Sequence, residues 1–152
     1  MDDAIKFALL TGAIITGSAG NNNKNTPHYP SDYDNVIKVG STDNDDSRSG
    51  FSNFGSRVNV AAPGGNIVST FPNNVYYSIS GTSMSAPYIS GLIGLLLSHD
   101  SSLTIAKVSE IVKHGVNFFG VDIPKPDKYI GEGRVNIKKS LSMINSISDV
   151  KA

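Results

Sequence analysis

The sequence predicts an α/β fold in which a mostly parallel sheet is flanked by helices. Short apolar and β-branched runs, such as 36–39 and 58–61, alternate with segments whose apolar residues recur at helical spacing. The 152 residues, of which 39% are hydrophobic, are enough for one domain with a sizeable core. Because the sequence shows no internal repeat and no interdomain linker, we expect one domain.

The first quarter of the chain is predicted to form a helix, a strand and a loop. Residues 4–11 have one apolar helical face, and Gly12 is expected to end the helix. Residues 13–19 are predicted as a short buried strand. The Gly-, Asn- and Pro-rich segment 20–27 then predicts a loop at the end of that strand, which is where ligands meet open α/β sheets.

The rest of the chain is predicted to contain further strands and two peripheral helices. The predicted strands are 36–39, 58–61, 67–71 and 75–79, the last two forming a hairpin. Thr104 is expected to cap a helix that ends near Gly115. Residues 116–128 are predicted to be irregular, and 135–144 to form a final helix.

The stretch 81–91 is predicted to be the end of a turn that runs into a buried helix. Pro87 is tolerated in a first helical turn, so we expect the helix to begin near residue 83 or 84. Residues 89–97 are apolar or small on every side, which favours a helix enclosed by protein.

Ser83 is a candidate nucleophile because of this position. The free N–H groups and the positive dipole end of a helix favour negative charge beside a serine hydroxyl. The alternative is that Thr82 or Ser83 only caps the helix, as Ser and Thr ordinarily do.

The motif Gly-Thr-Ser-Met-x-Ala-Pro-x-x-x-Gly at 81–91 resembles the nucleophile motif of the subtilisin-like serine proteases. Tyr88 stands where that family usually has a histidine, which is not its catalytic base. The similarity extends over almost the whole chain, at 18–21, 29–30, 36–40, 51–55, 58–64 and 131–136. It implies a three-layer α/β/α fold, of which residues 1–146 would be the C-terminal portion and 147–152 a frayed tail.

The resemblance also implies a set of site residues. Ser83 would be the nucleophile and Asn21 the donor that stabilises the oxyanion formed on the peptide carbonyl. Taken alone, Asn21 is equally explained as a turn former in an Asn-rich loop. The implied substrate-binding residues are Ser18, Ala19, Gly20, Asn22 and His28, the last two at the primary specificity pocket.

In this family the triad Asp and His precede the oxyanion Asn in chain order. No Asp-[Ser/Thr]-Gly or His-Gly-[Thr/His] pattern occurs before Asn21. We therefore expect the C-terminal half of a catalytic domain, without the Asp and His segments. His99 cannot replace the base, because 16 residues of helix place it about 24 Å from Ser83 at ~1.5 Å per residue.

The expected function is that of a serine-type endopeptidase acting on polypeptides by a Ser-His-Asp mechanism. The alternative is a catalytically inactive, truncated or degenerate module that binds or regulates another chain. A third hypothesis is an unrelated α/β binding domain in which the motifs are coincidental. The expected partners are a polypeptide substrate and the missing N-terminal half or a propeptide.

Composition excludes several other classes. The 13 basic and 13 acidic side chains cancel, so charge favours neither nucleic acid nor an anionic membrane as a partner. The absence of cysteine excludes disulfides, thiolate chemistry and Cys-ligated zinc. We expect no signal peptide in these residues, and no apolar run in them reaches the roughly 20 residues that span a membrane. The family implies secretion or the secretory pathway.

No cofactor is expected to be required. The resemblance implies that calcium is bound as a structural ion by the backbone carbonyls of Ser31, Tyr33 and Val36, to which Asp32 or Asp34 could add a ligand. A second acidic cluster at 43–46 lacks the ligand spacing of an EF-hand and is predicted to be a solvated loop.

Overall fold

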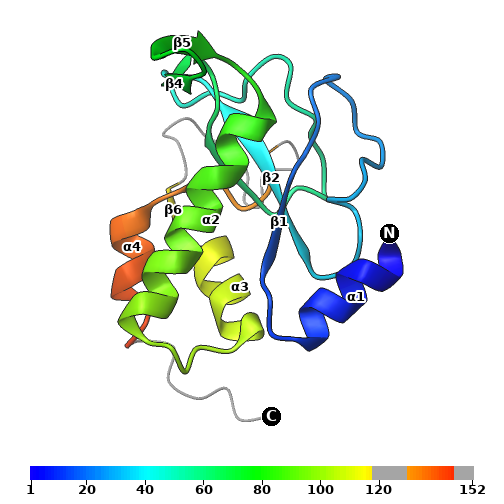
Figure 1. Cartoon of the computed structure of the whole chain (residues 1–152), viewed down its shortest axis with the longest axis vertical. Helices are drawn as coiled ribbons and strands as arrows, with labels where there is room; N and C mark the ends of the chain where they lie inside the picture. Colours follow the sequence, from blue (N-terminus) through cyan, green and yellow to red (C-terminus); the bar gives the residue numbers. More distant parts are fainter. Residues whose placement is uncertain (118–129, 146–152) are drawn as a thin grey trace.

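A computed structural model describes residues 1–117 and 130–145 (Figure 1). In chain order the helices and strands are α1 Asp2–Leu10, β1 Ile15–Ser18, β2 Val36–Thr42, β3 Val60–Pro63, β4 Ile67–Phe71, β5 Val75–Ile79, α2 Thr82–His99, α3 Ile105–His114, β6 Val116–Asn117, β7 Arg134–Val135 and α4 Ile137–Ser142.

The larger sheet has the strand order β1-β2-β3-β7-β6. Its pairs are parallel except β6 with β7, and β4 and β5 form a separate antiparallel hairpin. Figure 1 shows α2, α3 and α4 grouped together, with α1 apart from them beyond β1. This arrangement confirms the predicted α/β fold with a mostly parallel sheet.

The core lies between the sheet and α2, with α3 packed beside α2. It contains Val39 and Val60 from the sheet, Leu92 and Leu96 from α2, and Ile111 from α3. All seven residues of β2 are buried, whereas the four residues of β1 are only half-buried. The prediction of a buried first strand is therefore wrong, because β1 has a neighbouring strand on one side only among the described residues.

Most predicted elements are present with shifted ends. The hairpin strands 67–71 and 75–79 match the prediction at both ends. Helix α1 begins two residues earlier than predicted, and Asp2 and Asp3 lie in its first turn, where acidic side chains favour the helix dipole. Strand β3 begins two residues later than predicted, because the Val58 N–H closes a turn on the Gly55 carbonyl at 3.0 Å.

The two ends of the predicted final helix are also wrong. Val135, the first residue of the predicted helix, lies in β7 and pairs with β6, and α4 ends at Ser142, two residues earlier than predicted. Asn136 then caps α4, its side chain accepting a hydrogen bond from Lys139 N at 2.9 Å. The predicted irregular segment starts with β6, and its residues 118–128 lie outside the described residues, as does the predicted tail at 147–152.

Helix α2 begins at Thr82, so Pro87 lies inside the helix rather than in its first turn. Proline has no N–H, and the carbonyl of Ser83 therefore loses the hydrogen bond it would normally accept there. The N-cap residue is Gly81, which has no side chain, and the first-turn N–H of Thr82 is bonded instead by the side chain of Asn21. The hypothesis that Thr82 or Ser83 acts as an ordinary cap is thus not supported.

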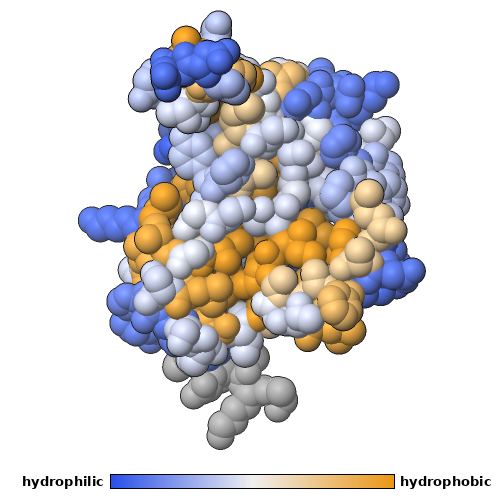
Figure 2. Space-filling model, in the orientation of Figure 1, coloured by the Kyte–Doolittle hydropathy of each residue, from blue (hydrophilic) through white to orange (hydrophobic). Residues whose placement is uncertain are grey.

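The outer side of α2 carries uncovered apolar residues. Figure 2 shows a hydrophobic band that crosses the molecule over α2 and toward α1. Pro87, Tyr88, Gly91, Leu95 and other residues line a groove of about 490 Å³ between α2 and α4. In the described part of the chain, no helix is both long enough and apolar enough to cross a membrane.

Candidate active site

Asn21 and the start of α2 are joined by hydrogen bonds between segments 61 residues apart in the chain. The backbone N–H of Thr82 donates to Asn21 Oδ1 at 2.9 Å, and the Thr82 hydroxyl donates to the same oxygen at 2.8 Å. The hydroxyl oxygen in turn accepts a hydrogen bond from Gly20 N at 3.1 Å. We call these three bonds the Thr82 latch. The latch fixes the orientation of the Asn21 carboxamide.

The latch uses the oxygen of the Asn21 carboxamide and leaves its nitrogen for another acceptor. Within the described residues, no acceptor is hydrogen-bonded to Asn21 Nδ2. A β-carbon placed on Gly81 would lie 3.4 Å from Asn21 Nδ2 and 3.8 Å from the backbone nitrogen of Ser83. Both nitrogens therefore lie within 4 Å of one point beside the turn that leads into α2.

Ser83 lies in the first turn of α2 and is exposed. Its N–H belongs to the first turn, whose donors have no intrahelical partner. Ser85, two residues on, is fully buried, so the two hydroxyls face different surroundings. Among the described residues, no histidine is hydrogen-bonded to Ser83, and His114 is instead paired with Glu110 at 3.1 Å.

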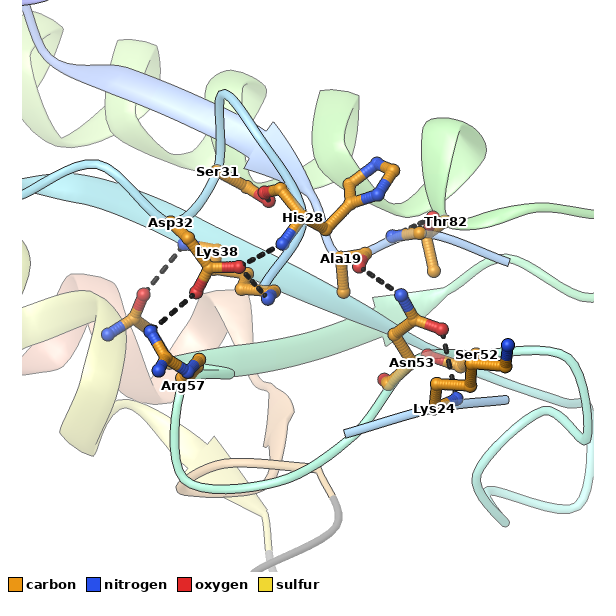
Figure 3. Close-up of polar contacts among 12 residues, drawn as sticks. Ala19, Lys24, His28, Ser31, Asp32, Lys38, Ser52, Asn53, Arg57 and Thr82 are labelled. Atoms are coloured by element: carbon orange, nitrogen blue, oxygen red, sulfur yellow. Dashed lines mark hydrogen bonds and ion pairs between the residues drawn. The ribbon is translucent and has the colours of Figure 1, made fainter. Parts of the chain in front are cut away.

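Asn53 holds the loop that carries Asn21, a role that sequence reasoning missed. Its side chain is buried and donates to the carbonyl of Ala19 at 2.9 Å (Figure 3). Its oxygen accepts from Asn22 N at 3.0 Å and from Lys24 N at 3.1 Å, and its own N–H donates to the Gly20 carbonyl at 2.8 Å. The only sequence signal was its place in the segment 51–55.

The predicted substrate-binding residues fall into two groups. Ala19 and Gly20 are buried, and their backbone groups are engaged by the sheet, by Asn53 and by Thr82. Ser18 and His28 are half-buried and Asn22 is exposed. The structure brings His28 against Gly20, because a β-carbon on that glycine would lie 2.9 Å from His28 Nδ1. Gly20 has a φ of 99°, which also favours glycine.

A buried ion pair lies beneath the His28 loop. Lys38 Nζ is 2.6 Å from Asp32 Oδ2, and the two side chains are 2% and 3% exposed. Arg57 lies 3.7 Å from the other carboxylate oxygen. Burial of the Asp32 carboxyl opposes ionisation, but hydrogen bonds from Lys38 and His28 N and the charges of Lys38 and Arg57 hold its pKa below the ordinary value.

The acidic cluster at 43–46 is tied to its own neighbours. Asp43 accepts a hydrogen bond from the Ser49 hydroxyl at 2.7 Å, and Asp46 pairs with Arg134 at 3.0 Å. Hydrogen bonds from the Ser47 hydroxyl and N–H lower the pKa of the exposed Asp45. The part of the chain that the structure describes contains no group of three or more His, Asp or Glu side chains placed to hold a metal.

Comparison with known proteins identifies a shared family. The model of the Subtilase family matches residues 1–135. Thermitase from Thermoactinomyces vulgaris is 38% identical over 141 residues, which are 93% of this chain and 48% of thermitase. Subtilisin DY from Bacillus licheniformis is 33% identical over 142 residues, which are 91% of this chain and 50% of that protein. The chain thus spans about half the length of these curated relatives.

Solved structures show the same similarity. A protease from Pseudoalteromonas arctica superposes with a TM-score of 0.85 at 27% identity, covering 94% of this chain and 46% of that one. The patellamide maturation protease PatA superposes with a TM-score of 0.86 at 26% identity, covering 95% of this chain and 56% of that one. These matches confirm the resemblance drawn from the motifs.

Proposed function

The chain belongs to the subtilase family, and we propose that it carries the nucleophile and an oxyanion donor of a serine-type endopeptidase. In this proposal Ser83 Oγ attacks the carbonyl carbon of a peptide bond. Asn21 Nδ2 and the Ser83 N–H donate hydrogen bonds to the carbonyl oxygen as it becomes negatively charged. The reaction is hydrolysis of polypeptide, as the names of the relatives suggest.

The Thr82 latch is the observation that carries this proposal. An oxyanion donor is effective when it is already oriented, because then no reorganisation is needed as charge develops. Thr82 binds the carboxamide oxygen twice and so turns the nitrogen away from itself. In a subtilisin, loss of one such donor costs about 2.7–4 kcal/mol, a value taken from that enzyme rather than from this chain.

The base and acid of the triad are proposed to come from outside this chain. A serine hydroxyl needs an adjacent base to become a strong nucleophile. Thermitase and subtilisin DY are about twice as long as the matched region, so a complementary half is the proposed source of the His and Asp. In this proposal the base takes the proton of Ser83 Oγ and gives it to the leaving amine, and a water molecule then hydrolyses the acyl-enzyme, so the chemistry calls for no cofactor.

The substrate side chain before the cleaved bond is proposed to lie beside His28 and Asn22. His28 is half-buried against Gly20, directly before Asn21, and Asn22 directly follows it. His28 is therefore close in space to the residue before the proposed oxyanion donor, and Asn22 is next to that donor in sequence. Ser18, Ala19 and Gly20 would supply the backbone surface on which this part of the substrate lies.

A second candidate function is a non-catalytic module that binds another chain. The observation that favours it is the uncovered apolar groove on α2, whose lining residues Tyr88 and Leu95 are 39% and 48% exposed. A helix face of this kind marks a protein interaction site. The two functions differ in whether the bound chain contributes a base to Ser83.

An assay of peptide hydrolysis tests the proposal. The chain is mixed with a polypeptide that carries the complementary half, and turnover is measured. Asn21→Ala is expected to lower kcat by about 100- to 1,000-fold with little change in KM, because the donor acts mainly in the transition state. Asn44→Ala, in an exposed loop, is the matched control. A complex with no turnover would favour the binding module, and a defect of Asn21→Ala confined to KM would remove the oxyanion role.

A further inference from the structure

Lys38 lies in the middle of β2 with its side chain almost completely buried. Lysine is rarely buried unless its charge is paired, because removing an ammonium group from water is costly. The only carboxylate that the structure places within ion-pair distance of Lys38, among the described residues, is that of Asp32 at 2.6 Å. Packing alone does not explain why a charged pair is buried here. The contacts of Asp32 with the turn 28–32 suggest a further role.

Asp32 connects Lys38 to the backbone N–H of His28 (Figure 3) and is also hydrogen-bonded to the His28 carbonyl. The N–H of His28 donates a short hydrogen bond to the Asp32 carboxylate, and the N–H of Asp32 donates to the His28 carbonyl at 3.1 Å. The Ser31 hydroxyl donates to the same carbonyl at 2.6 Å. The turn 28–32 is thus closed around a carboxylate whose charge is balanced by Lys38.

This turn holds the backbone of His28, whose ring lies against Gly20. The ring packs against Gly20, and Asn53 approaches the same glycine from its Nδ2. Gly20 precedes Asn21 and donates its N–H to the Thr82 latch. Lys38, Asp32 and His28 thus form a chain of contacts that reaches Gly20, the residue before Asn21.

The same loop is where the family resemblance implied calcium, and two of the donors that would bind that ion are already engaged. Calcium takes 6–8 oxygen ligands. The Asp32 carboxylate is already engaged by Lys38, His28 N and Arg57, and the Tyr33 carbonyl accepts a hydrogen bond from Val36 N at 3.2 Å. Two covalently attached cations beside the carboxylate would also repel a divalent ion.

We propose that the Lys38 ammonium group takes the place of a structural metal ion in this loop and, through Asp32, positions His28 against Gly20. The loop then needs no calcium. The significance of His28 for substrate binding rests on the proposed function, whereas the replacement of a metal by Lys38 does not. Lys38 is a positioning residue in this proposal and touches no substrate.

The test compares the buried pair with the exposed pair of Lys6 and Asp2, whose 2.7 Å separation matches it but whose side chains are 65% and 47% exposed. Thermal unfolding of the full chain is measured in calcium chloride and in excess EDTA for wild type, Lys38→Met and Lys6→Met. The wild type is expected to give the same Tm in both, because a ligand stabilises only a protein that binds it. Lys38→Met is expected to lower the Tm, and Lys6→Met to leave it unchanged.

Limited proteolysis supplies the local measurement. The double variant Lys38→Met with Asp32→Asn removes both charges and so avoids leaving one buried charge unpaired, which keeps the fold testable if the single variant does not fold. Cleavage within residues 22–35 is expected to be faster in the double variant than in Lys6→Met, with the rest of the chain equally resistant.

Two results would overturn the proposal. One is a wild-type Tm that rises with calcium and loses this response in Asp32→Asn, since the loop would then hold the metal. The other is cleavage within residues 22–35 at the wild-type rate in the double variant. Neither measurement uses peptidase activity. The proposal for Lys38 can therefore be wrong while the roles proposed for Ser83 and Asn21 are right, and those roles can be wrong while the proposal for Lys38 is right.

Discussion

On its inner face α2 presents Ile89, Leu92 and Leu96 to the sheet and to α3, and none of them is more than 1% exposed. On its outer face Leu95 is 48% and Tyr88 39% exposed, although both side chains are large and mostly hydrocarbon. The helix therefore has the composition of a fully enclosed helix, but the residues that the structure describes cover only one side of it. The uncovered side is where the proposed complementary half would pack.

The two serines near the start of α2 repeat this contrast. Ser85 is buried on the inner side, where a β-carbon on Gly64 would collide with its hydroxyl oxygen. Ser83 is exposed. The inner face therefore serves the stability of this chain, whereas the outer face and the start of the helix are available for binding and chemistry.

Two adjacent leucines give the largest expected difference between the faces. Leu96→Ala should lower the free energy of unfolding by about 2–5 kcal/mol, because it leaves a cavity in the core. Leu95→Ala should change it by only about 0.5 kcal/mol, since its side chain is largely in solvent. Urea denaturation of both variants checks this. Equal losses would show that the outer face is also covered in this chain.

Substitution of Asn53 should give the next largest loss of free energy of unfolding. This side chain, and not the inner face of α2, holds the loop that carries Asn21. Asn53→Ala leaves the buried carbonyl of Ala19 and two loop N–H groups without their partner, which should cost about 1–3 kcal/mol. Hydrogen exchange should be faster at the amides of Asn22 and Lys24. Asn22→Ala, which removes an exposed side chain, is the control. Unchanged protection at both amides would show that Asn53 does not hold this loop.

Substitutions at the starts of α2 and α3 should give the smallest difference in the free energy of unfolding. Thr104 caps α3, its hydroxyl accepting a hydrogen bond from Lys107 N at 3.3 Å, and Thr104→Ala should cost about 1 kcal/mol. Ser83→Ala should cost less than about 0.5 kcal/mol, because Ser83 is exposed and is not the residue that caps α2. Thermal unfolding compares the two. A loss of stability in Ser83→Ala as large as that in Thr104→Ala would indicate a structural role for Ser83.

Sequence patterns predicted the elements whose signals are local. The hairpin 67–79 has two β-branched or aromatic runs around a Pro-Asn-Asn turn, and the Thr104 cap precedes an amphipathic helix, so both were found. Strand β7 has only two residues, which is too short for any periodic pattern, and it was missed. The incomplete cover of α2 was also missed. The composition of a helix indicates that it can be enclosed by protein, but it does not indicate which residues enclose it.

The candidate site was also predicted only where its signals are local in the sequence. The motif around Ser83 and the position of Asn21 after a strand were visible in the sequence. The Thr82 latch, the Asn53 contacts and the Lys38–Asp32 pair join polar residues 61, 34 and 6 positions apart. Such contacts depend on how strands and loops come together in space, and no spacing in the sequence predicts them.

Labelling with a fluorophosphonate probe tests the central claim most directly, namely that the outward serine of α2 is the nucleophile and the inward one is not. The chain is mixed with a polypeptide that carries the complementary half, and the labelled residue is located by mass spectrometry. The account predicts labelling of wild type and of Ser85→Ala at residue 83, and no labelling of Ser83→Ala. Labelling of Ser83→Ala at the wild-type level would contradict it.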